Sequence, residues 1–299
     1  MSTIQASLVR LLVKYKISKL LHPEISVDEQ RKRLDQLSIL SFHSPFTRIK
    51  EVFIGETQAD WISHRSAHSD FVILYLHGGG YNIGSSTASR LLAERLSAKS
   101  QAIVLTPNYR LAPEHPFPAA LEDVLACYDW LLARGFSPHK IALAGDSAGG
   151  GLVLSTALSI RDSKRPLPSS LVMLCPWLDL TLSGGSVKAN EKKDCMLSAP
   201  WLAKMAENYA GTRDKALPQL SPLFDDLQGL PPALVQVGKE ELLLDDSRRF
   251  AERYRAAGNH VLLDEWKSMW HVWQLFVKYL PEANQAVSQA GEFIRKQWA

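Results

Sequence analysis

The sequence predicts an α/β fold in which a mostly parallel central sheet is flanked by helices on both faces. Two observations lead to this prediction. Short apolar runs alternate with longer segments of helical pattern, and the apolar runs are continuous rather than alternating in polarity. Continuous runs are typical of strands buried on both faces, and strand–helix alternation is typical of right-handed βαβ units. The 299 residues, 46% of them hydrophobic, suffice for one large core.

The expected elements follow one another regularly in the first half of the chain. In order they are a strand at 71–76, a helix around 86–99, a strand at 102–106, a helix around 118–133, a strand at 141–145 and a helix around 148–160. Three later apolar runs are expected to be strands of the same sheet, at 171–175, 233–237 and 261–265.

Two segments depart from this alternation. Residues 1–45 have a helical pattern with no strand, and residues 180–222 are polar and irregular except for a helical piece at 199–210. We expect the two segments to pack together as a helical cap over one end of the sheet. The core of the α/β domain is then formed by residues 46–179 and 223–299.

The N-terminal stretch MSTIQASLVRLLVKYKISKLL is expected to form an amphipathic helix. Its apolar residues are interrupted by Arg10, Lys14, Lys16 and Lys19, so it lacks the apolar core of a signal peptide. No run in the chain approaches the ~18 apolar residues of a membrane span, which argues against an integral membrane protein. Packing on the protein itself is the favoured interpretation of this helix, and contact with a membrane surface is the alternative.

Charge and cysteine content exclude several classes of function. A net charge of +3, with no basic run interleaved with aromatic residues, argues against nucleic-acid binding. The three cysteines, Cys127, Cys175 and Cys195, show no C-x-x-C spacing. A disulfide framework and a structural zinc site are therefore not expected, and a reducing cytoplasm is the expected compartment.

The pentapeptide GDSAG at 145–149 follows an expected strand and precedes an expected helix. A G-x-S-x-G sequence in that context predicts a sharp strand-to-helix turn that holds Ser147 out of the backbone as a nucleophile. Gly145 and Gly149 would remove the side chains that collide in such a turn. The alternative is a tight turn without chemistry.

The sequence HGGGY at 77–81 follows another expected strand directly. Consecutive glycines cost conformational entropy, which makes sense where a backbone must approach another group closely. We therefore expect an oxyanion hole formed by the N–H groups of Gly79, Gly80 and Ala148, the residue after the predicted nucleophile. The alternative is a flexible surface loop.

A nucleophilic serine needs a base, and His271 is the candidate among nine histidines. It comes just after the last expected strand, at the same sheet edge as Ser147, and opens a helical pattern. The alternative is a core histidine within a cluster of tryptophans.

A histidine base needs an acid to orient it, and four acids follow the strand at 233–237. Asp245 and Asp246 read as the first turn of the next helix, where acids complement the helix dipole. Glu240 and Glu241 remain, and their positions alone do not separate them.

These residues together resemble the bacterial hormone-sensitive-lipase-like esterases, family IV of the α/β-hydrolase superfamily. The resemblance covers most of the chain from about residue 50 onward. The matching stretches are HGGGY (77–81), YRLAPEHPFPAALED (109–123), GDSAGG (145–150), PWLDLT (176–181), SPLFDDLQGLPP (221–232), ELLLDDS (241–247) and HVWQ (271–274).

The resemblance implies an α/β-hydrolase core under a helical cap, and a serine carboxylesterase that cleaves short- to medium-chain acyl esters without metal or cofactor. The implied triad is Ser147, an acid and His271. Many members have an aspartate followed by Pro-Leu as the acid, whereas the matching position here is Glu241, as in a related E-x-L-L-x-D version of the motif. Glu241 is therefore expected to be the acid, with Glu240 as second choice. Relatives imply a monomer or a homodimer.

Two functions other than ester hydrolysis remain open. The same site could hydrolyse amides or other acyl compounds. The same fold also serves as a hormone receptor in plants, where the base histidine is missing and the pocket only binds a small molecule. The presence of His271 argues against that second alternative.

Overall fold

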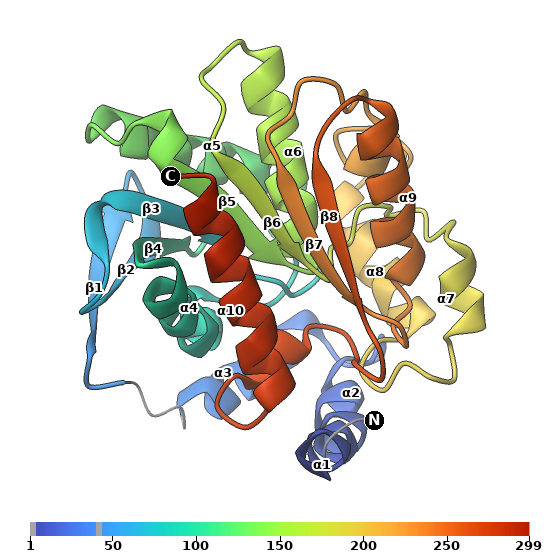
Figure 1. Ribbon diagram of the computed structural model, residues 1–299. Coiled ribbons are helices and arrows are strands. Elements are labelled where there is room, and N and C mark those ends of the chain that lie inside the picture. The colour runs from blue at the N-terminus through green and yellow to red at the C-terminus, as the bar shows by residue number, and fades with distance from the viewer. Residues whose placement is uncertain (1–3, 40–43, 299) are drawn as a thin grey trace.

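The computed structural model of the protein describes residues 4–39 and 44–298, and these form one sheet of eight strands with helices around it (Figure 1). The strand order is β1-β2-β4-β3-β5-β6-β7-β8. β2 pairs antiparallel with β1 and β4, and all remaining neighbours are parallel, so the predicted mostly parallel sheet is confirmed. The strands are β1 (Thr47–Ile54), β2 (Thr57–His64), β3 (His68–Leu76), β4 (Ala102–Pro107), β5 (Ile141–Asp146), β6 (Ser170–Leu174), β7 (Ala233–Gly238) and β8 (Val261–Trp266).

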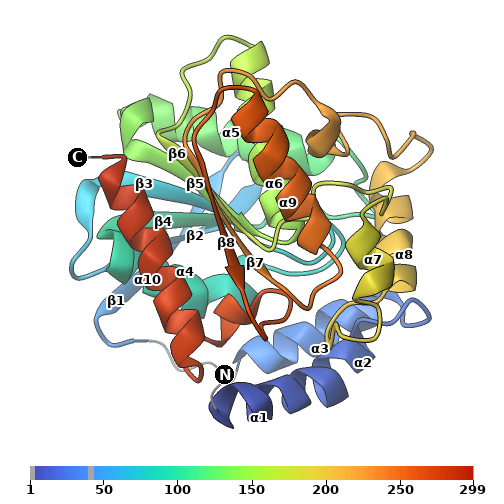
Figure 2. The same ribbon diagram turned by 45° about the vertical axis from the view of Figure 1, so that its right-hand side comes forward.

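Helices cover both faces of this sheet, as Figures 1 and 2 show. On one face α4 and α10 contact each other and form an apolar cluster with the sheet. On the other face α5, α6 and α9 contribute to a second, larger cluster. The helices of this core are α4 (Ser86–Ser100), α5 (Ala119–Ala133), α6 (Ala148–Asp162), α9 (Leu244–Ala256) and α10 (Pro281–Lys296). The predicted alternation of strands and helices is confirmed.

The structure contains two strands that the sequence pattern did not predict. β1 and β2 form a hairpin at one edge of the sheet, where β1 has a mostly exposed or half-exposed surface. An edge strand with one face in water carries polar side chains and lacks the continuous apolar run of a central strand. Neither segment therefore stood out from its surroundings.

The expectation that a helix begins at His271 is wrong. Val272 adopts a left-handed conformation with φ +47°, which no helix interior tolerates. Only a short 3-10 helix follows, η4 (Trp273–Phe276), and α10 begins at Pro281. His271 therefore lies in a loop rather than at a helix start.

The two segments outside the α/β alternation contact each other, as Figure 2 shows. Trp201 Nε1 donates to Gln30 Oε1 at 2.9 Å, and Arg10 donates to the carbonyl of Lys193 at 2.9 Å. Residues 1–3 and 40–43 of the N-terminal segment lie outside the described residues. The elements of the two segments are α1 (Ile4–Leu12), η1 (Val13–Ile17, a π-helix), α2 (Ser18–Leu20), α3 (Val27–Ile39), α7 (Gly185–Ala189) and α8 (Ala199–Ala210). Two 3-10 turns complete the chain: η2 (Pro138–Lys140) precedes β5, and η3 (Pro222–Phe224) begins at the end of the second segment.

None of the helices in the described ranges combines the length and the apolar character needed to cross a bilayer.

Candidate active site

Ser147 occupies the turn between β5 and α6 in a conformation that L residues rarely adopt, with φ +54° and ψ −122°. Such backbone strain is typical of a nucleophile held at the end of a strand. The flanking glycines explain how the turn is possible. A Cβ on Gly149 would lie 2.0 Å from the carbonyl oxygen of Leu76, and one on Gly145 would lie 2.6 Å from the carbonyl oxygen of Gly149.

This packing predicts that Gly149→Ala destabilises the fold. The added methyl group meets backbone atoms of Leu76 and His77 that cannot rotate away, so we expect the free energy of unfolding to fall by about 3 kcal/mol. Urea unfolding of both proteins measures the effect. Gly185→Ala is the control, because its Cβ would meet only the end of a side chain at 3.3 Å. Equal stabilities of the two variants would contradict this account of the turn.

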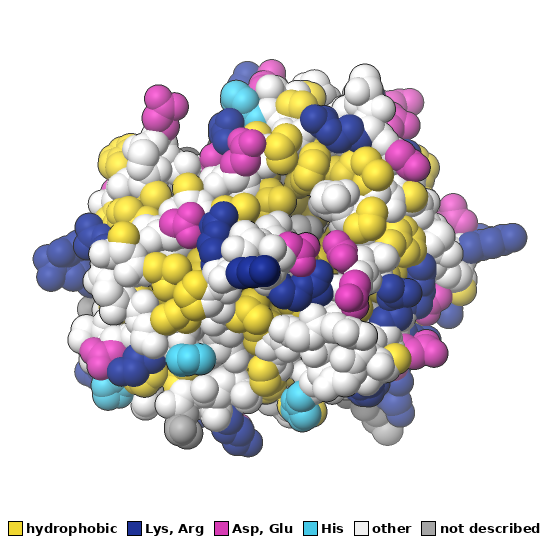
Figure 3. Space-filling model, turned by 90° about the horizontal axis from the view of Figure 1, so that it is seen from above, with side chains coloured by type: hydrophobic (Ala, Val, Ile, Leu, Met, Phe, Trp, Pro, Cys, Tyr) yellow, Lys and Arg dark blue, Asp and Glu magenta, His cyan; other side chains and the backbone are white. Residues whose placement is uncertain are grey.

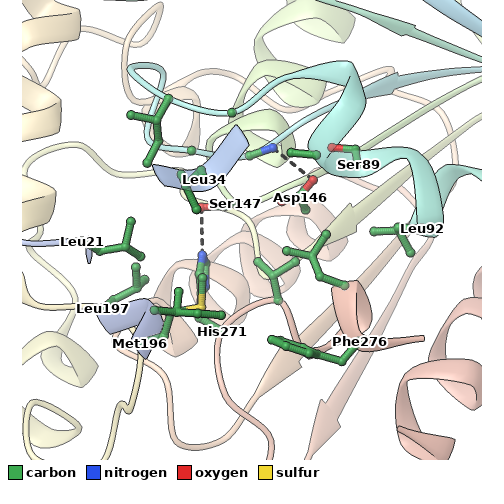
Figure 4. Close-up of a pocket in the computed structure, with 18 of the residues that line it drawn as sticks. Leu21, Leu34, Ser89, Leu92, Asp146, Ser147, Met196, Leu197, His271 and Phe276 are labelled. Carbon is green, nitrogen blue, oxygen red and sulfur yellow. Dashed lines mark hydrogen bonds between the residues drawn. The ribbon is translucent and has the colours of Figure 1, made fainter. Parts of the chain in front are cut away.

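Three of the predicted site residues are joined by two consecutive contacts. The Oγ of Ser147 is 2.8 Å from His271 Nε2, and His271 Nδ1 is 2.7 Å from Glu241 Oε2. Figure 4 shows the first of these contacts from the side of the pocket. All three residues are buried. They come from the ends of β5, β7 and β8, which lie at the carboxyl edge of the sheet, where ligands bind in open α/β folds.

The structure distinguishes the two glutamates that the sequence left open. Glu241 also accepts a hydrogen bond from the N–H of Gly238 at 2.6 Å, which fixes its carboxylate behind His271. Glu240 points elsewhere and forms an ion pair with Arg10 of α1. The neighbouring acids Asp245 and Asp246 lie in the first turn of α9, as predicted.

The contacts among Ser147, His271 and Glu241 allow a proton to move from the serine hydroxyl to the imidazole. A carboxylate only accepts hydrogen bonds, so Nδ1 of His271 carries its proton toward Glu241 and Nε2 is left to accept from the hydroxyl of Ser147. A histidine in that tautomer can take the serine proton and bear the resulting charge beside the carboxylate.

The predicted oxyanion loop follows β3 and is held in a tight turn. The carbonyl of Gly78 accepts from His77 Nδ1 at 2.8 Å, and the carbonyl of Gly79 accepts from the N–H of Asn82 at 3.1 Å. Because N–H and C=O point in opposite directions across a trans peptide, the N–H groups of Gly79 and Gly80 point away from the donors, His77 and Asn82. Both glycines have positive φ, +121° and +61°, which favours glycine at these positions.

His77 supports this loop instead of acting as a base. Its ring stacks on Tyr109 with the centroids 4.3 Å apart, and burial lowers the pKa of His77 to about 4. The neutral ring donates through Nδ1 to the loop carbonyl. The hydroxyl of Tyr109 donates to the carbonyl of His77 at 2.6 Å. Tyr109, the first residue of the YRLAPE stretch, thus packs against the start of the glycine loop.

A buried acid that the sequence analysis did not single out ties the glycine loop to the serine turn. Asp146 Oδ1 accepts from the Tyr75 hydroxyl at 2.6 Å and from the Gly78 N–H at 3.0 Å. The second contact is the other dashed line in Figure 4. Because Asp146 directly precedes Ser147, these two bonds fix the distance between the serine turn and the loop. The position of Asp146 in the GDSAG motif, next to Ser147, was the sequence signal that could have identified it.

Asp146 also makes stability depend on pH. Burial raises the pKa of its carboxyl from 3.8 to about 6, against the opposing effect of the Tyr75 hydrogen bond. The folded state holds this proton more tightly than the unfolded state, so stability is lost as the pH rises from about 4 to about 6, by about 3 kcal/mol. Asp146→Asn cannot titrate. We therefore expect the variant to gain about 3 kcal/mol relative to the parent between these pH values, measured by urea unfolding. Parallel pH profiles of the two proteins would contradict the prediction.

Two more residues position the triad candidates, and neither has a motif that could have revealed it. Asp194 Oδ2 accepts from the N–H of Leu242 at 2.9 Å, so the segment at 180–222 holds the loop that carries Glu241. Cys175 Sγ accepts from the N–H of Val272 at 3.2 Å, next to His271. Burial raises the pKa of both groups.

The site also contains a potential metal-ligand set. Cys175, Glu241 and His271 each offer one ligand atom, and these atoms lie within 4.8 Å of one another. A cation bound there would have to separate the carboxylate from the imidazole, which would break the line that leads to Ser147. This set therefore fits an inhibitory metal better than a working one.

A pocket of about 330 Å³ opens in front of Ser147 and His271. Figure 4 shows that leucine, methionine and phenylalanine side chains surround the reactive pair. No lysine or arginine lies among the described residues of its wall. The apolar wall is formed by Ile17, Leu21, Leu34, Ile83, Ala88, Leu91, Leu92, Met196, Leu197, Trp201, Val272, Leu275, Phe276 and Tyr279.

The chain is similar to known hydrolases and esterases. A family model described as the alpha/beta hydrolase fold matches residues 73–275. An acetyl-hydrolase of Streptomyces hygroscopicus is 42% identical over 82% of this chain and 81% of its own length. An esterase of Acinetobacter venetianus is 38% identical over 88% of this chain and 87% of its own length.

Solved structures give the same result over the whole chain. The crystal structure of an esterase from the bacterial hormone-sensitive lipase family superimposes with a TM-score of 0.96 at 39% identity, covering 100% of both chains. The chain therefore belongs to the alpha/beta hydrolase fold family and, within it, to the bacterial hormone-sensitive-lipase esterases.

Proposed function

We propose that this protein is a serine carboxylesterase that hydrolyses short- to medium-chain acyl esters. Ser147 is the nucleophile, His271 the general base and Glu241 the acid that orients the histidine. The observation that carries this proposal is the continuous line of contacts, 2.8 Å from Ser147 to His271 and 2.7 Å from His271 to Glu241. Its family membership supports the ester as the bond that is cleaved.

The proposed reaction has two steps of acyl transfer. His271 Nε2 takes the proton of Ser147 while Oγ attacks the ester carbonyl. The C–O bond to the alcohol then breaks, and the alcohol leaves with the proton from His271. Water, deprotonated by the same nitrogen, attacks the acyl-serine and releases the carboxylic acid together with the restored hydroxyl.

The developing oxyanion would be held by the backbone N–H groups of Gly79, Gly80 and Ala148. The glycine loop lines the pocket beside Ser147. Ala148 begins α6, so its N–H belongs to the first turn of a helix, where backbone donors have no partner within the helix. Donors fixed in this way stabilise the transition state without having to reorganise.

The substrate class follows from the pocket wall. An apolar wall without a cation suits a neutral acyl chain better than an anionic substrate. A volume of about 330 Å³ is at the lower end for ligand pockets, which favours short and medium chains.

We further propose that residues 1–45 and 180–222 act as a cap on a core formed by 46–179 and 223–299. Side chains of both segments, among them Leu21, Leu34 and Leu197, form part of the pocket wall. The hydrogen bond between Gln30 and Trp201 joins the two segments directly. The cap would thus set the acyl chain length. A cytoplasmic location and a monomeric or homodimeric state stay predictions, the first of them supported by three free cysteines.

A series of p-nitrophenyl esters from acetate to palmitate tests the proposed function. We expect kcat/KM to peak at short or medium chains and to be lower by about tenfold or more for palmitate, because the pocket cannot take the whole chain. A matched p-nitroanilide separates esterase from amidase activity, and we expect the ester to be much the faster substrate. Binding of esters without turnover would instead indicate a receptor of the same fold.

A further inference from the structure

The helical stretch that opens the chain, α1 with η1, has two apolar faces. One face packs against the protein: Ala6 and Val13 are buried in the cluster that also contains α4 and α10. The other face is exposed, with side chains from 51% (Leu11) to 83% (Ile4) accessible. The exposed set is Ile4, Leu8, Leu11, Leu12 and Tyr15.

The spacing of this exposed set places its members on one side of the helix. They lie at intervals of four, three, one and three residues, as one apolar stripe requires. Half of the ten large hydrophobic side chains that are exposed in the described part of the chain belong to this short stretch. Figures 1 and 2 place α1 at the periphery of the molecule, below the sheet. The stripe therefore faces outward, with Lys14 of the same stretch placed over the ring of Tyr15.

The charged side chains of this helical stretch itself are all positive. Residues 1–21 contain no aspartate or glutamate. Arg10 is used in the ion pair with Glu240, whereas Lys14, Lys16 and Lys19 are exposed. The face seen in Figure 3, which is turned away from α1, instead carries acidic and basic side chains next to one another. The positive charge is thus a property of the helix and not of the whole surface.

We propose that this face of α1 and η1 docks on an anionic phospholipid bilayer. An apolar stripe flanked by lysines is the pattern of helices that lie in the interface of a membrane, with the lysine stems reaching to the headgroups. Attraction to anionic lipids adds to the burial of the stripe. A second copy of the chain is a poorer occupant, because a symmetric contact through this face would bring the lysines of both copies together.

Docking would place the pocket next to the membrane. Ile17 and Leu21, which follow the stripe in the chain, form part of the pocket wall, as does the exposed Tyr279. An ester that leaves the bilayer at this point would therefore travel only a short way to Ser147. Docking itself depends on the helix alone and does not require the proposed chemistry.

Sedimentation of the full-length protein with vesicles tests the proposal. We expect binding to vesicles of phosphatidylcholine mixed with phosphatidylglycerol, weak binding to phosphatidylcholine alone, and loss of binding at high salt. Leu8→Glu should weaken binding by about tenfold or more, since it puts a negative charge into the stripe that docking would bury. Replacing Lys14, Lys16 and Lys19 with glutamine should weaken it by on the order of fivefold per lysine.

Phe53→Glu on β1 is the matched control, because Phe53 and Leu8 are both 62% exposed. It should bind vesicles as the parent does, and all variants should turn over dissolved p-nitrophenyl butyrate at the parent's rate. Three results would overturn the proposal: no binding to the anionic vesicles, an equal loss with Phe53→Glu, or a dimer on size-exclusion chromatography that Leu8→Glu converts to a monomer.

Discussion

Replacing Ser147 with alanine should lower kcat for ester hydrolysis by on the order of 10⁴–10⁶-fold. The substitution removes the proposed nucleophile, and His271 then has no hydroxyl within reach at that position to activate. Some rate above that of water should persist, because the proposed oxyanion donors are backbone groups that the variant keeps. The fold should survive, since alanine is small and the strained turn depends on the glycines around it. Turnover of p-nitrophenyl butyrate measures the loss, and circular dichroism checks the fold.

Ser155→Ala provides a matched control for this experiment. Ser155 lies two turns further along α6 and is as little exposed as Ser147, at 7%. It has no contact with His271, so we expect its turnover to equal that of the parent. A fluorophosphonate probe should label the parent and Ser155→Ala but not Ser147→Ala. Undiminished turnover or labelling of Ser147→Ala in a clean preparation would rule out Ser147 as the nucleophile.

Local sequence predicted the parts of the fold that depend on local pattern. The central strands were visible because they are buried on both faces and must be apolar throughout. The turn at Ser147 was visible because it needs glycines at fixed places, which backbone collisions dictate. β1 and β2 were missed because β1 is an edge strand with mostly exposed or half-exposed side chains, and because β2 carries no continuous apolar run.

The orientation of the acids could not be predicted in the same way. Glu240 and Glu241 are chemically identical neighbours, and their environments are set by distant parts of the chain. Arg10, from the first helix, pairs with Glu240. Asp194, from residues 180–222, accepts from the N–H of Leu242 and so fixes the loop that carries Glu241. Interactions over such separations leave no periodic signal in the sequence.

The loop after His271 illustrates a different limit. The residues of this loop have the apolar spacing of a helix. The loop nevertheless has to place the His271 imidazole beside Ser147. Val272 takes a left-handed conformation, and its N–H is held by the sulfur of Cys175, a residue of the neighbouring strand end. The position of the His271 ring, held against Ser147, therefore overrides the local helical preference.

The glutamate pair gives the second large expected effect. Glu241→Gln should lower kcat by on the order of 10³–10⁴-fold, while Glu240→Gln should change it only a few-fold. A glutamine at position 241 keeps the size of the side chain but can donate to His271 Nδ1. The ring would then carry its proton on Nε2, where it can no longer accept the proton of Ser147. The glutamine would also lack the negative charge that stabilises the protonated imidazole of His271.

Glu240→Gln is a close control because it makes the same chemical change one residue away. It removes the ion pair with Arg10, which is partly exposed and contributes about 1 kcal/mol or less to stability. Steady-state kinetics on p-nitrophenyl butyrate should show the fall in kcat with little change in KM, since neither glutamate lines the pocket. If Glu240→Gln were the inactive variant and Glu241→Gln the active one, the contact between Glu241 and His271 would not be the one that serves the reaction. The acid would then have to reach the histidine through a rearrangement of the loop that follows β7.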